Sequence, residues 1–337
     1  MPKAYVYRGS PEGRAVRHEA ADTTEPLTSK QILVRITHSG ICGTDEHYKT
    51  QDIVLGHEGV GIVECAGSSV KSLKRGDRVG WGYCHGSCMA CSECARGQQL
   101  YCDSRQLYGS TNLDQGSLAS HAVWEAEEFL FSIPASMSSA AAAPLMCAGA
   151  AVYSALNAVQ VRWSDRVGVV GIGVLGHLAI QFAAKMGCHV VAYSHSPNKQ
   201  ADAVAFGAAE FQCLSSWDGK KMTGDPGPVD HLLLAVSQQP DWGKIIPLVR
   251  RGGTIVAMTV DPDELRVPYM ELVMNAISIR GSLPAPPRLH QEMLQFAAFQ
   301  RVLPTVQTFP FTEDGINEAM DKLRKGKIRY RAVVAQE

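Results

Sequence analysis

The sequence predicts an α/β protein in which a domain with a doubly wound parallel sheet is inserted into a second, mostly β domain. The chain has 337 residues, more than a single hydrophobic core ordinarily organises. Residues 1–149 are rich in Gly, His and Cys and alternate short β-branched runs with glycine turns. Residues 150–285 alternate strand-like with helix-like apolar runs, the pattern of βαβ units. We therefore expect the parallel sheet in residues 150–285 and the mostly β domain in residues 1–149 and 286–337.

The elements of the inserted domain follow one another in a regular order. A short apolar run predicts a buried strand over residues 166–170, and the apolar stretch 174–186 predicts a helix directly after it. The alternation continues through predicted strands at residues 189–193, 230–236 and 253–258 and a predicted helix at residues 198–206. In the mostly β domain the sequence predicts strands at residues 31–36 and 330–334, a helix at residues 291–299, and a helix from the cap Thr312 to Gly326.

Composition places the chain among globular proteins and argues against several classes of partner. Hydrophobic residues make up 45% of the chain and charged residues 19%, and the formal net charge is -1. A nearly neutral chain gives no reason to expect a nucleic-acid partner or an anionic membrane surface. The sequence shows neither a secretory signal nor an apolar run approaching the ~18 residues of a membrane helix. We expect a cytoplasmic protein with no membrane or nucleic-acid partner.

Four of the ten cysteines lie in one short segment and predict a structural zinc site. Cys88, Cys91, Cys94 and Cys102 give the pattern C-x2-C-x2-C-x7-C. Four thiolates from one loop suit tetrahedral zinc, and without a secretory signal metal binding is favoured over disulfides. The alternatives are incidental buried thiols or an iron–sulfur cluster. Cys84, just upstream, is interpreted as a packed free thiol.

A six-residue segment predicts a dinucleotide site. The glycines of the motif G-x-G-x-x-G are Gly171, Gly173 and Gly176, with Val174 and Leu175 between the last two. A predicted strand precedes the motif and an apolar helix follows it, which is the context of a Rossmann-type pyrophosphate site at a helix N-terminus. An ordinary glycine-rich strand–helix turn is the alternative.

Three scattered segments carry a resemblance to a known family. They read G-I-C-G-T-D-E-H at residues 40–47, G-H-E-G-V-G at residues 56–61 and P-L-M-C-A-G at residues 144–149, with the four-cysteine segment between the second and the third. In this order they resemble the zinc-dependent medium-chain alcohol dehydrogenases over essentially the whole chain. The nearest branch is that of the cinnamyl-alcohol-dehydrogenase-like enzymes, which includes fungal and microbial NADP-dependent aldehyde reductases. The resemblance implies a GroES-like catalytic domain, a Rossmann-type domain and a homodimer.

The resemblance also implies a second, catalytic zinc, so that each chain would bind two. Its ligands would be Cys42, His57 and Cys147, with the fourth position open to water or substrate. Glu58 follows the histidine and approaches the same metal in the family, where it can exchange with the water. Asp45 is the carboxylate expected to orient a ligand imidazole.

Two further residues would carry the proton released from the alcohol. Thr44 stands two residues after a ligand, where the family places its relay hydroxyl. His47 stands where many members place the terminal histidine, which suits this task because it titrates near neutral pH. The alternative for His47 is a plain surface histidine.

The end of the predicted strand at residues 189–193 indicates the cofactor. NAD enzymes usually place Asp or Glu there, whereas in this chain no carboxylate appears before Asp202. Ser194 can hydrogen-bond a 2′-phosphate and Lys199 can neutralise it, while His195 stands where some relatives carry arginine. We therefore expect NADP(H). The alternative is a neutral turn with a solvated lysine, in an enzyme that uses both NAD(H) and NADP(H).

The expected reaction is hydride transfer between NADP(H) and a small alcohol/aldehyde pair, in particular primary aromatic or allylic alcohols and their aldehydes. Only residues 43–56 separate Cys42 from His57, fewer than in many relatives, so we expect an altered pocket mouth. One alternative is reduction of an iminium or a conjugated alkene on the same scaffold. Another is a non-catalytic oligomeric relative, which would be expected to have lost zinc ligands. Residues 277–280 could pair across a two-fold axis or form an interior strand.

Overall fold

The computed structural model describes residues 4–20, 26–217, 227–258, 260–261 and 263–336. The chain divides into two compact units. The β-rich unit consists of Met1–Ala150, Ala285–Phe299 and Leu303–Glu337. The parallel-sheet unit consists of Ala151–Pro284 and Gln300–Val302.

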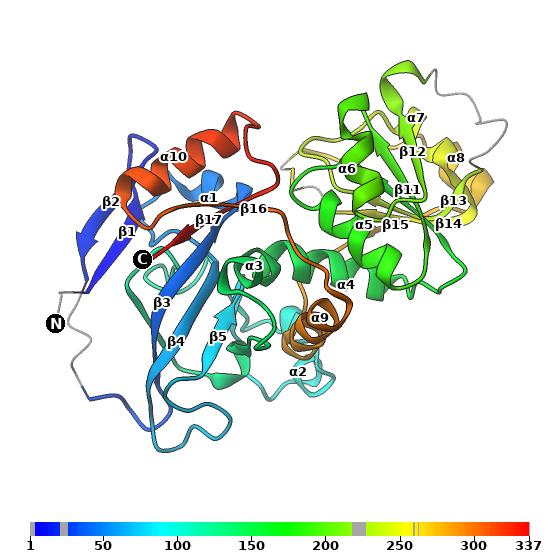
Figure 1. Cartoon of the computed structure of the whole chain (residues 1–337). Helices are drawn as coiled ribbons and strands as arrows, with labels where there is room; N and C mark the ends of the chain where they lie inside the picture. The colour runs from blue at the N-terminus through cyan, green and yellow to red at the C-terminus, as the bar shows by residue number, and fades with distance from the viewer. Residues whose placement is uncertain (1–3, 21–25, 218–226, 259, 262, 337) are drawn as a thin grey trace. The chain divides into compact units, whose positions relative to one another are not determined.

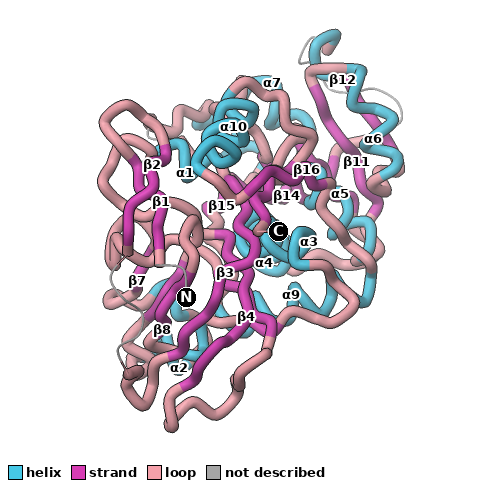
Figure 2. The backbone as a smooth tube through the Cα atoms, turned by 60° about the vertical axis from the view of Figure 1, so that its left-hand side comes forward, coloured by secondary structure: helices cyan, strands magenta, loops and turns pink. Residues whose placement is uncertain are grey.

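The β-rich unit is organised around a mixed sheet with the strand order β16-β17-β3-β4-β5-β9, in which β8 also pairs with β3. Strands β3 and β4 lie side by side along most of their length (Figure 2). The sheet strands are β3 (Ile32–Ile41), β4 (Glu58–Ala66), β5 (Arg78–Trp81), β8 (His121–Trp124), β9 (Phe131–Ser132), β16 (Val306–Pro310) and β17 (Arg331–Ala335). Two separate two-stranded antiparallel sheets lie outside it, β1 (Tyr5–Gly9) with β2 (Ala15–Glu19) and β6 (Cys84–Gly86) with β7 (Gln106–Leu107).

The helices of the β-rich unit are mostly short. They are α1 (Gly43–Tyr48), α2 (Ser92–Ala95), α3 (Ser139–Pro144), α9 (Pro287–Gln300, reaching just past the unit's boundary) and α10 (Glu313–Arg324), with short 3₁₀ turns at Gln99–Tyr101 and Glu127–Phe129 and a π-helical turn at Leu145–Gly149. The side chain of Thr312 caps α10 by accepting a hydrogen bond from Gly315 N–H at 3.2 Å. Helix α10 packs against β16 and β17 (Figure 1).

The core of the β-rich unit follows from the alternation of β3. Ile32, Val34 and Ile36 are fully buried, as expected for every second residue of a strand with one face on the core. Gly59 on β4 faces Trp81 on β5 so closely that an added Cβ would lie 2.2 Å from the indole ring. Glycine is therefore required beside the buried Trp81, directly after Glu58.

The parallel-sheet unit confirms the predicted doubly wound fold. Its strands run in the order β12-β11-β10-β13-β14-β15 and all pair in parallel, which is the dinucleotide-binding arrangement. The strands are β10 (Arg166–Val170), β11 (His189–Ser194), β12 (Glu210–Cys213), β13 (Val229–Leu234), β14 (Val249–Ala257) and β15 (Ser278–Gly281). Strand β15 ends this order, so it lies at an edge rather than in the interior of the sheet.

Helices cover both faces of the parallel sheet, with α5 and α6 on one side and α7 and α8 on the other (Figure 1). The helices of this unit are α4 (Ala150–Ala158, starting at the unit's boundary), α5 (Gly176–Lys185), α6 (Gln200–Ala205), α7 (Trp242–Ile245) and α8 (Tyr269–Asn275), with 3₁₀ turns at Pro197–Lys199, Leu214–Ser216 and Ile246–Leu248. The predicted helix over residues 174–186 is confirmed within two residues at each end. Its side chains Leu178, Ile180 and Phe182 are fully buried.

One helical stretch, Ser139–Ala158, is long and apolar enough to cross a membrane by length and composition. Within the structure 67% of its most apolar window is buried, as in the core helix of a folded protein. The stretch is therefore weak evidence for a membrane span.

Candidate metal centres and dinucleotide site

The first candidate site gathers residues from three distant parts of the β-rich unit. Cys42 directly precedes α1, His57 directly precedes β4, and Glu58 is the first residue of β4. Cys147 lies in the π-helical turn Leu145–Gly149. One ligand atom of each residue lies within 4.8 Å of those of the other three. Both His57 and Glu58 are fully buried, while Cys42 and Cys147 are half-buried.

A proline explains the local geometry around Cys147. Pro144 has no N–H, so a regular helix cannot continue through it with all of its hydrogen bonds. The chain widens directly afterwards into the π-helical turn that contains Cys147. Such single π turns occur often at functional sites.

Asp45 fixes two of the candidate ligands at once. It is the third residue of α1, and its Oδ2 accepts the backbone N–H of Cys42 at 2.8 Å. Its Oδ1 lies 3.0 Å from Nδ1 of His57. With Nδ1 engaged, Nε2 of His57 is the ring nitrogen left for a metal, and among the described residues this buried atom has no hydrogen-bond partner. This arrangement fits a zinc ion, whose histidine ligands typically hold a carboxylate on their other nitrogen.

The electrostatics of the cluster favour a thiolate at Cys42. A hydrogen bond from Cys147 lowers the pKa of the Cys42 thiol well below its ordinary value, against the opposing effect of burial, and His57 lowers it further. A thiolate is the form of cysteine that binds metal.

Arg331, which sequence reasoning missed, lies next to this cluster. Its guanidinium forms an ion pair with the Glu58 carboxylate, and both side chains are fully buried. Burial raises the pKa of Glu58 to about 7, although Arg331 acts to lower it. Arg331 stands at the start of β17, and one signal could have found it: a charged residue among the apolar residues of a strand near the C-terminus.

The two expected relay residues lie on α1 beside the cluster. The Thr44 hydroxyl lies 3.8 Å from the sulfur of Cys42 and is half-buried. His47 is exposed on the same helix.

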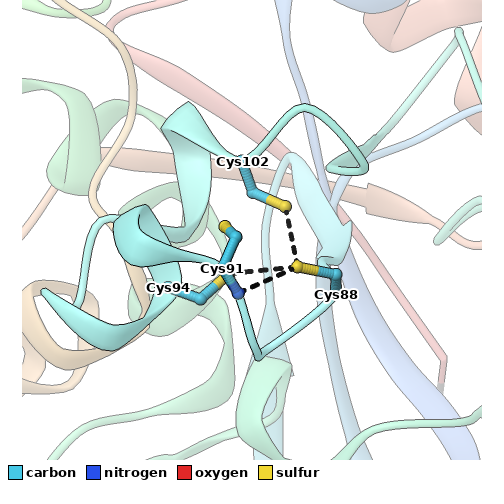
Figure 3. Close-up of side chains that lie close together, drawn as sticks. All are labelled: Cys88, Cys91, Cys94 and Cys102. Atoms are coloured by element: carbon cyan, nitrogen blue, oxygen red, sulfur yellow. Dashed lines mark hydrogen bonds between the residues drawn. The ribbon is translucent and has the colours of Figure 1, made fainter.

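The four cysteines of the second candidate site come together around α2 (Figure 3). The Cys88 sulfur lies 3.5 Å from that of Cys102 and 3.9 Å from that of Cys94, and it accepts the N–H of Cys91 at 3.4 Å. Backbone hydrogen bonds from Ala90 and Cys91 lower the pKa of the Cys88 thiol to about 6, which favours the thiolate. The group offers four sulfur ligands, enough to fill a tetrahedral site without an open position, so it suits a structural zinc.

Cys84 is buried beside this lobe. Its sulfur lies 3.6 Å from the carbonyl oxygen of Gly86, and burial raises its pKa to about 11. It lies outside both candidate ligand groups.

The glycine motif stands between β10 and α5. Gly171 has φ +91°, and Gly176 lies so close to it that an added Cβ would meet its carbonyl oxygen at 1.7 Å. An added Cβ at Gly173 would meet no atom within 4 Å. The backbone is thus tight where strand and helix pack and open at the middle glycine, with Val174 and Leu175 half-buried before the helix. This geometry fits a dinucleotide pyrophosphate.

The three polar residues expected for the cofactor lie at the end of β11 and in the turn after it. Ser194 is the last residue of the strand and is buried, and its Oγ accepts the N–H of Ser196 at 3.1 Å. His195 is exposed, and Lys199 is half-buried at the end of the turn Pro197–Lys199. No carboxylate occupies residues 194–199.

Comparison with known families decides the assignment. Residues 28–135 match the alcohol dehydrogenase GroES-like domain, and residues 174–298 match the zinc-binding dehydrogenase domain. The chain belongs to the zinc-dependent medium-chain alcohol dehydrogenases. The predicted GroES-like and Rossmann-type fold is thereby confirmed, as is the resemblance to the cinnamyl-alcohol-dehydrogenase-like branch.

Individual relatives in this family align with nearly the whole length of this chain. An alcohol dehydrogenase of Geobacillus stearothermophilus is 34% identical, covering 91% of this chain and 92% of that protein. The NADP-dependent alcohol dehydrogenase C 1 of Mycolicibacterium smegmatis is 32% identical over 94% of this chain and 96% of that protein. Among solved structures, a cinnamyl alcohol dehydrogenase of Sorghum bicolor superposes with a TM-score of 0.89 at 27% identity, covering 99% of this chain and 97% of that one.

Family membership establishes the general chemistry. This dehydrogenase is an oxidoreductase acting on the CH–OH group of small alcohols or on the corresponding carbonyl compounds, and zinc is its metal.

Proposed function

We propose that this dehydrogenase catalyses NADP(H)-dependent hydride transfer between primary alcohols and aldehydes, in particular aromatic or allylic ones. The observation that carries the proposal is the buried cluster of Cys42, His57, Glu58 and Cys147, whose ligand atoms lie within 4.8 Å of one another. Two thiolates and one imidazole leave a fourth position for substrate, which is the ligand set of a catalytic rather than a structural zinc.

Each residue of the cluster has a proposed role. Cys42, His57 and Cys147 bind the zinc, and Asp45 holds the His57 ring in the orientation that directs Nε2 to the metal. Glu58, paired with Arg331, lies among the ligands and can exchange with water at the fourth position.

The relay residues move the proton that the reaction releases. When bound, zinc would act as a Lewis acid that lowers the pKa of the alcohol hydroxyl, and NADP⁺ would accept the hydride. Thr44 Oγ1, beside Cys42, would accept the hydroxyl proton as it releases its own, and the exposed imidazole of His47 on the same helix would take up the released proton and pass it to solvent.

The preference for NADP(H) rests on the turn after β11. Ser194 still has its hydroxyl hydrogen to donate, because its oxygen is the acceptor in its bond with Ser196. His195 and Lys199 offer cationic or donor groups in a turn without a carboxylate. The motif residues Gly171, Gly173, Val174, Leu175 and Gly176 would hold the pyrophosphate, and the relatives include an enzyme named as NADP-dependent.

Four further assignments complete the proposal. A second zinc is bound by Cys88, Cys91, Cys94 and Cys102 and stabilises a lobe with little core of its own. The catalytic domain comprises residues 1–149 and 286–337 and the dinucleotide domain residues 150–285. The protein acts in the cytoplasm. It forms a homodimer, which the edge position of β15 and the exposed apolar residues of α8 support: Tyr269, Met270, Val273 and Met274.

Oxidation of NADPH and, separately, of NADH should be followed with aromatic, allylic and aliphatic aldehydes, with and without a zinc chelator. We expect chelator-sensitive turnover with NADPH and the highest kcat/KM with the aromatic or allylic aldehydes. An absence of turnover with every aldehyde, despite bound zinc and cofactor, would contradict the proposal and redirect it to an iminium or conjugated alkene. Equal kcat/KM with NADH would contradict the cofactor assignment alone.

A further inference from the structure

We infer that Tyr108 is a positioning residue of the catalytic metal centre, acting through Asp45 and the ring of His57. The inference deepens the proposed function and rests on it, because it assumes that Cys42, His57 and Cys147 bind the catalytic zinc. Tyr108 follows β7, outside the segments that carry the proposed ligands, and only residues 103–107 separate it from Cys102.

The hydroxyl of Tyr108 joins two parts of the ligand framework. It donates a hydrogen bond to Oδ1 of Asp45 at 3.0 Å, the same oxygen that lies 3.0 Å from Nδ1 of His57. It also accepts the backbone N–H of Gly56 at 2.9 Å, directly before His57. The phenol therefore contacts both the carboxylate that orients the imidazole and the backbone that delivers it.

These contacts determine how Asp45 can lie. Its Oδ2 is held by the backbone of Cys42, and its Oδ1 accepts from His57 and Tyr108. A carboxylate with donors on both oxygens has no freedom to rotate without breaking one of them. Asp45 is fully buried and Tyr108 is 2% exposed, so water cannot readily replace a lost partner.

The phenol ring restrains the imidazole as well. The rings of Tyr108 and His57 stack with centroids 4.9 Å apart and an interplanar angle of 29°. Tyr48 packs edge-on against Tyr108, with ring centroids 5.4 Å apart and an interplanar angle of 85°. A glycine follows Tyr108 because an added Cβ at Gly109 would lie 2.3 Å from the Tyr48 ring. The position of the phenol is thus fixed by packing and not only by its hydroxyl.

The test is Tyr108→Phe in the zinc-loaded enzyme, a change that keeps the ring and removes the hydroxyl. Zinc release to a chromogenic chelator is followed over time. The kinetic phase of zinc release that is missing in Cys147→Ser is assigned to the catalytic centre. We expect this phase to be about 10-fold faster in Tyr108→Phe, the lower end of the effect of residues that orient metal ligands. Release from the four-cysteine site should be unchanged, and in the Co²⁺-substituted enzyme the visible bands of the catalytic centre should shift.

Tyr7→Phe is the matched control. Tyr7 is equally buried in the same unit, and its hydroxyl hydrogen-bonds the carbonyl of Phe311 at 3.4 Å, away from both cysteine clusters. Its removal should leave zinc release unchanged. An unaltered catalytic phase in Tyr108→Phe, or an equal acceleration in Tyr7→Phe, would overturn the inference. A wild-type protein that lacks the catalytic phase altogether would instead refute the proposed zinc site.

Asp45→Asn tests whether Tyr108 acts through the carboxylate. If it does, adding Tyr108→Phe to Asp45→Asn should accelerate release less than about 2-fold, because residues acting in series are not additive. A full 10-fold further acceleration would show that Tyr108 acts by another route and would overturn the inference in its stated form.

Discussion

Replacing Arg331 by methionine should destabilise the β-rich unit far more than the loss of one surface charge. Arg331 and Glu58 pair with both side chains fully buried, so the substitution leaves the Glu58 carboxylate in the core without its cation. Methionine fills much of the volume of the arginine stem, so the loss is mainly electrostatic.

The magnitude follows from the burial of the pair. Removing one partner of a buried ion pair costs about 3–5 kcal/mol, because the other charge stays desolvated. For a unit of this size each kcal/mol lowers Tm by about 2–4 °C, so Arg331→Met should lower it by about 6–20 °C. Arg331→Met with Glu58→Gln should recover much of the loss, since a neutral amide is cheaper to bury than a charge.

Differential scanning calorimetry measures the Tm of each variant. The zinc concentration is held constant, because a metal that binds only the folded state raises Tm. Arg35→Met is the matched control. Arg35 lies on β3 of the same sheet and pairs with Glu64 at 3.2 Å, with side chains 43% and 39% exposed. An exposed pair contributes about 0–1 kcal/mol, so Tm should fall by no more than about 4 °C. If Arg331→Met shifted Tm no more than Arg35→Met, the reasoning from burial would be refuted.

Three further predictions concern the metal, the cofactor and pH. Cys147→Ser should abolish alcohol oxidation while cofactor affinity, measured by NADPH fluorescence, stays nearly intact; retained turnover would refute the assignment of Cys147. Lys199→Ala should weaken NADPH binding by about 1–3 kcal/mol and barely change NADH binding, whereas equal losses for both would remove its phosphate-binding role. Partial burial acts to raise the pKa of Glu210, but hydrogen bonds from Arg166 and His189 outweigh it and leave the pKa below its ordinary value. A carboxyl group whose pKa is lowered in the folded protein stabilises the fold above its unfolded pKa, and this stabilisation is lost as pH falls. Glu210→Gln should therefore flatten the decline in Tm between about pH 5 and about pH 3. An unchanged slope in this range would contradict the contribution of Glu210.

The inserted domain could be predicted closely because its signals are local. The apolar run at residues 166–170 is β10 as predicted, and the glycine motif adjoins it. Strand β3 was harder, since residues 31–36 were predicted and Ile32–Ile41 is observed. Its second half, with Thr37, His38 and Ser39, is too polar to predict a strand by itself. Pairing with β4 on one side and with β17 or β8 on the other extends it, a tertiary effect that overrides local propensity.

The partners of the proposed ligands could not be predicted for a related reason. Arg331 meets Glu58 only because β17 pairs with β3 and β3 with β4, which joins the two ends of the chain in one sheet. Tyr108 is one of several tyrosines in an irregular segment, and nothing in the local pattern sets it apart from Tyr101. Ligand spacing is visible in a sequence, whereas the residues that orient ligands become visible only in three dimensions.

The short segment between Cys42 and His57 is held at both ends, each time beside a proposed zinc ligand. Its first end is fixed by Asp45, which holds the N–H of Cys42 at 2.8 Å. Its second end is fixed by Tyr108, which holds the N–H of Gly56 at 2.9 Å. Between them Arg8 holds the Asp52 side chain at 2.5 Å. Because each proposed ligand is secured beside its own position in the chain, we predict that the length of the segment between them affects the pocket mouth more than the metal centre.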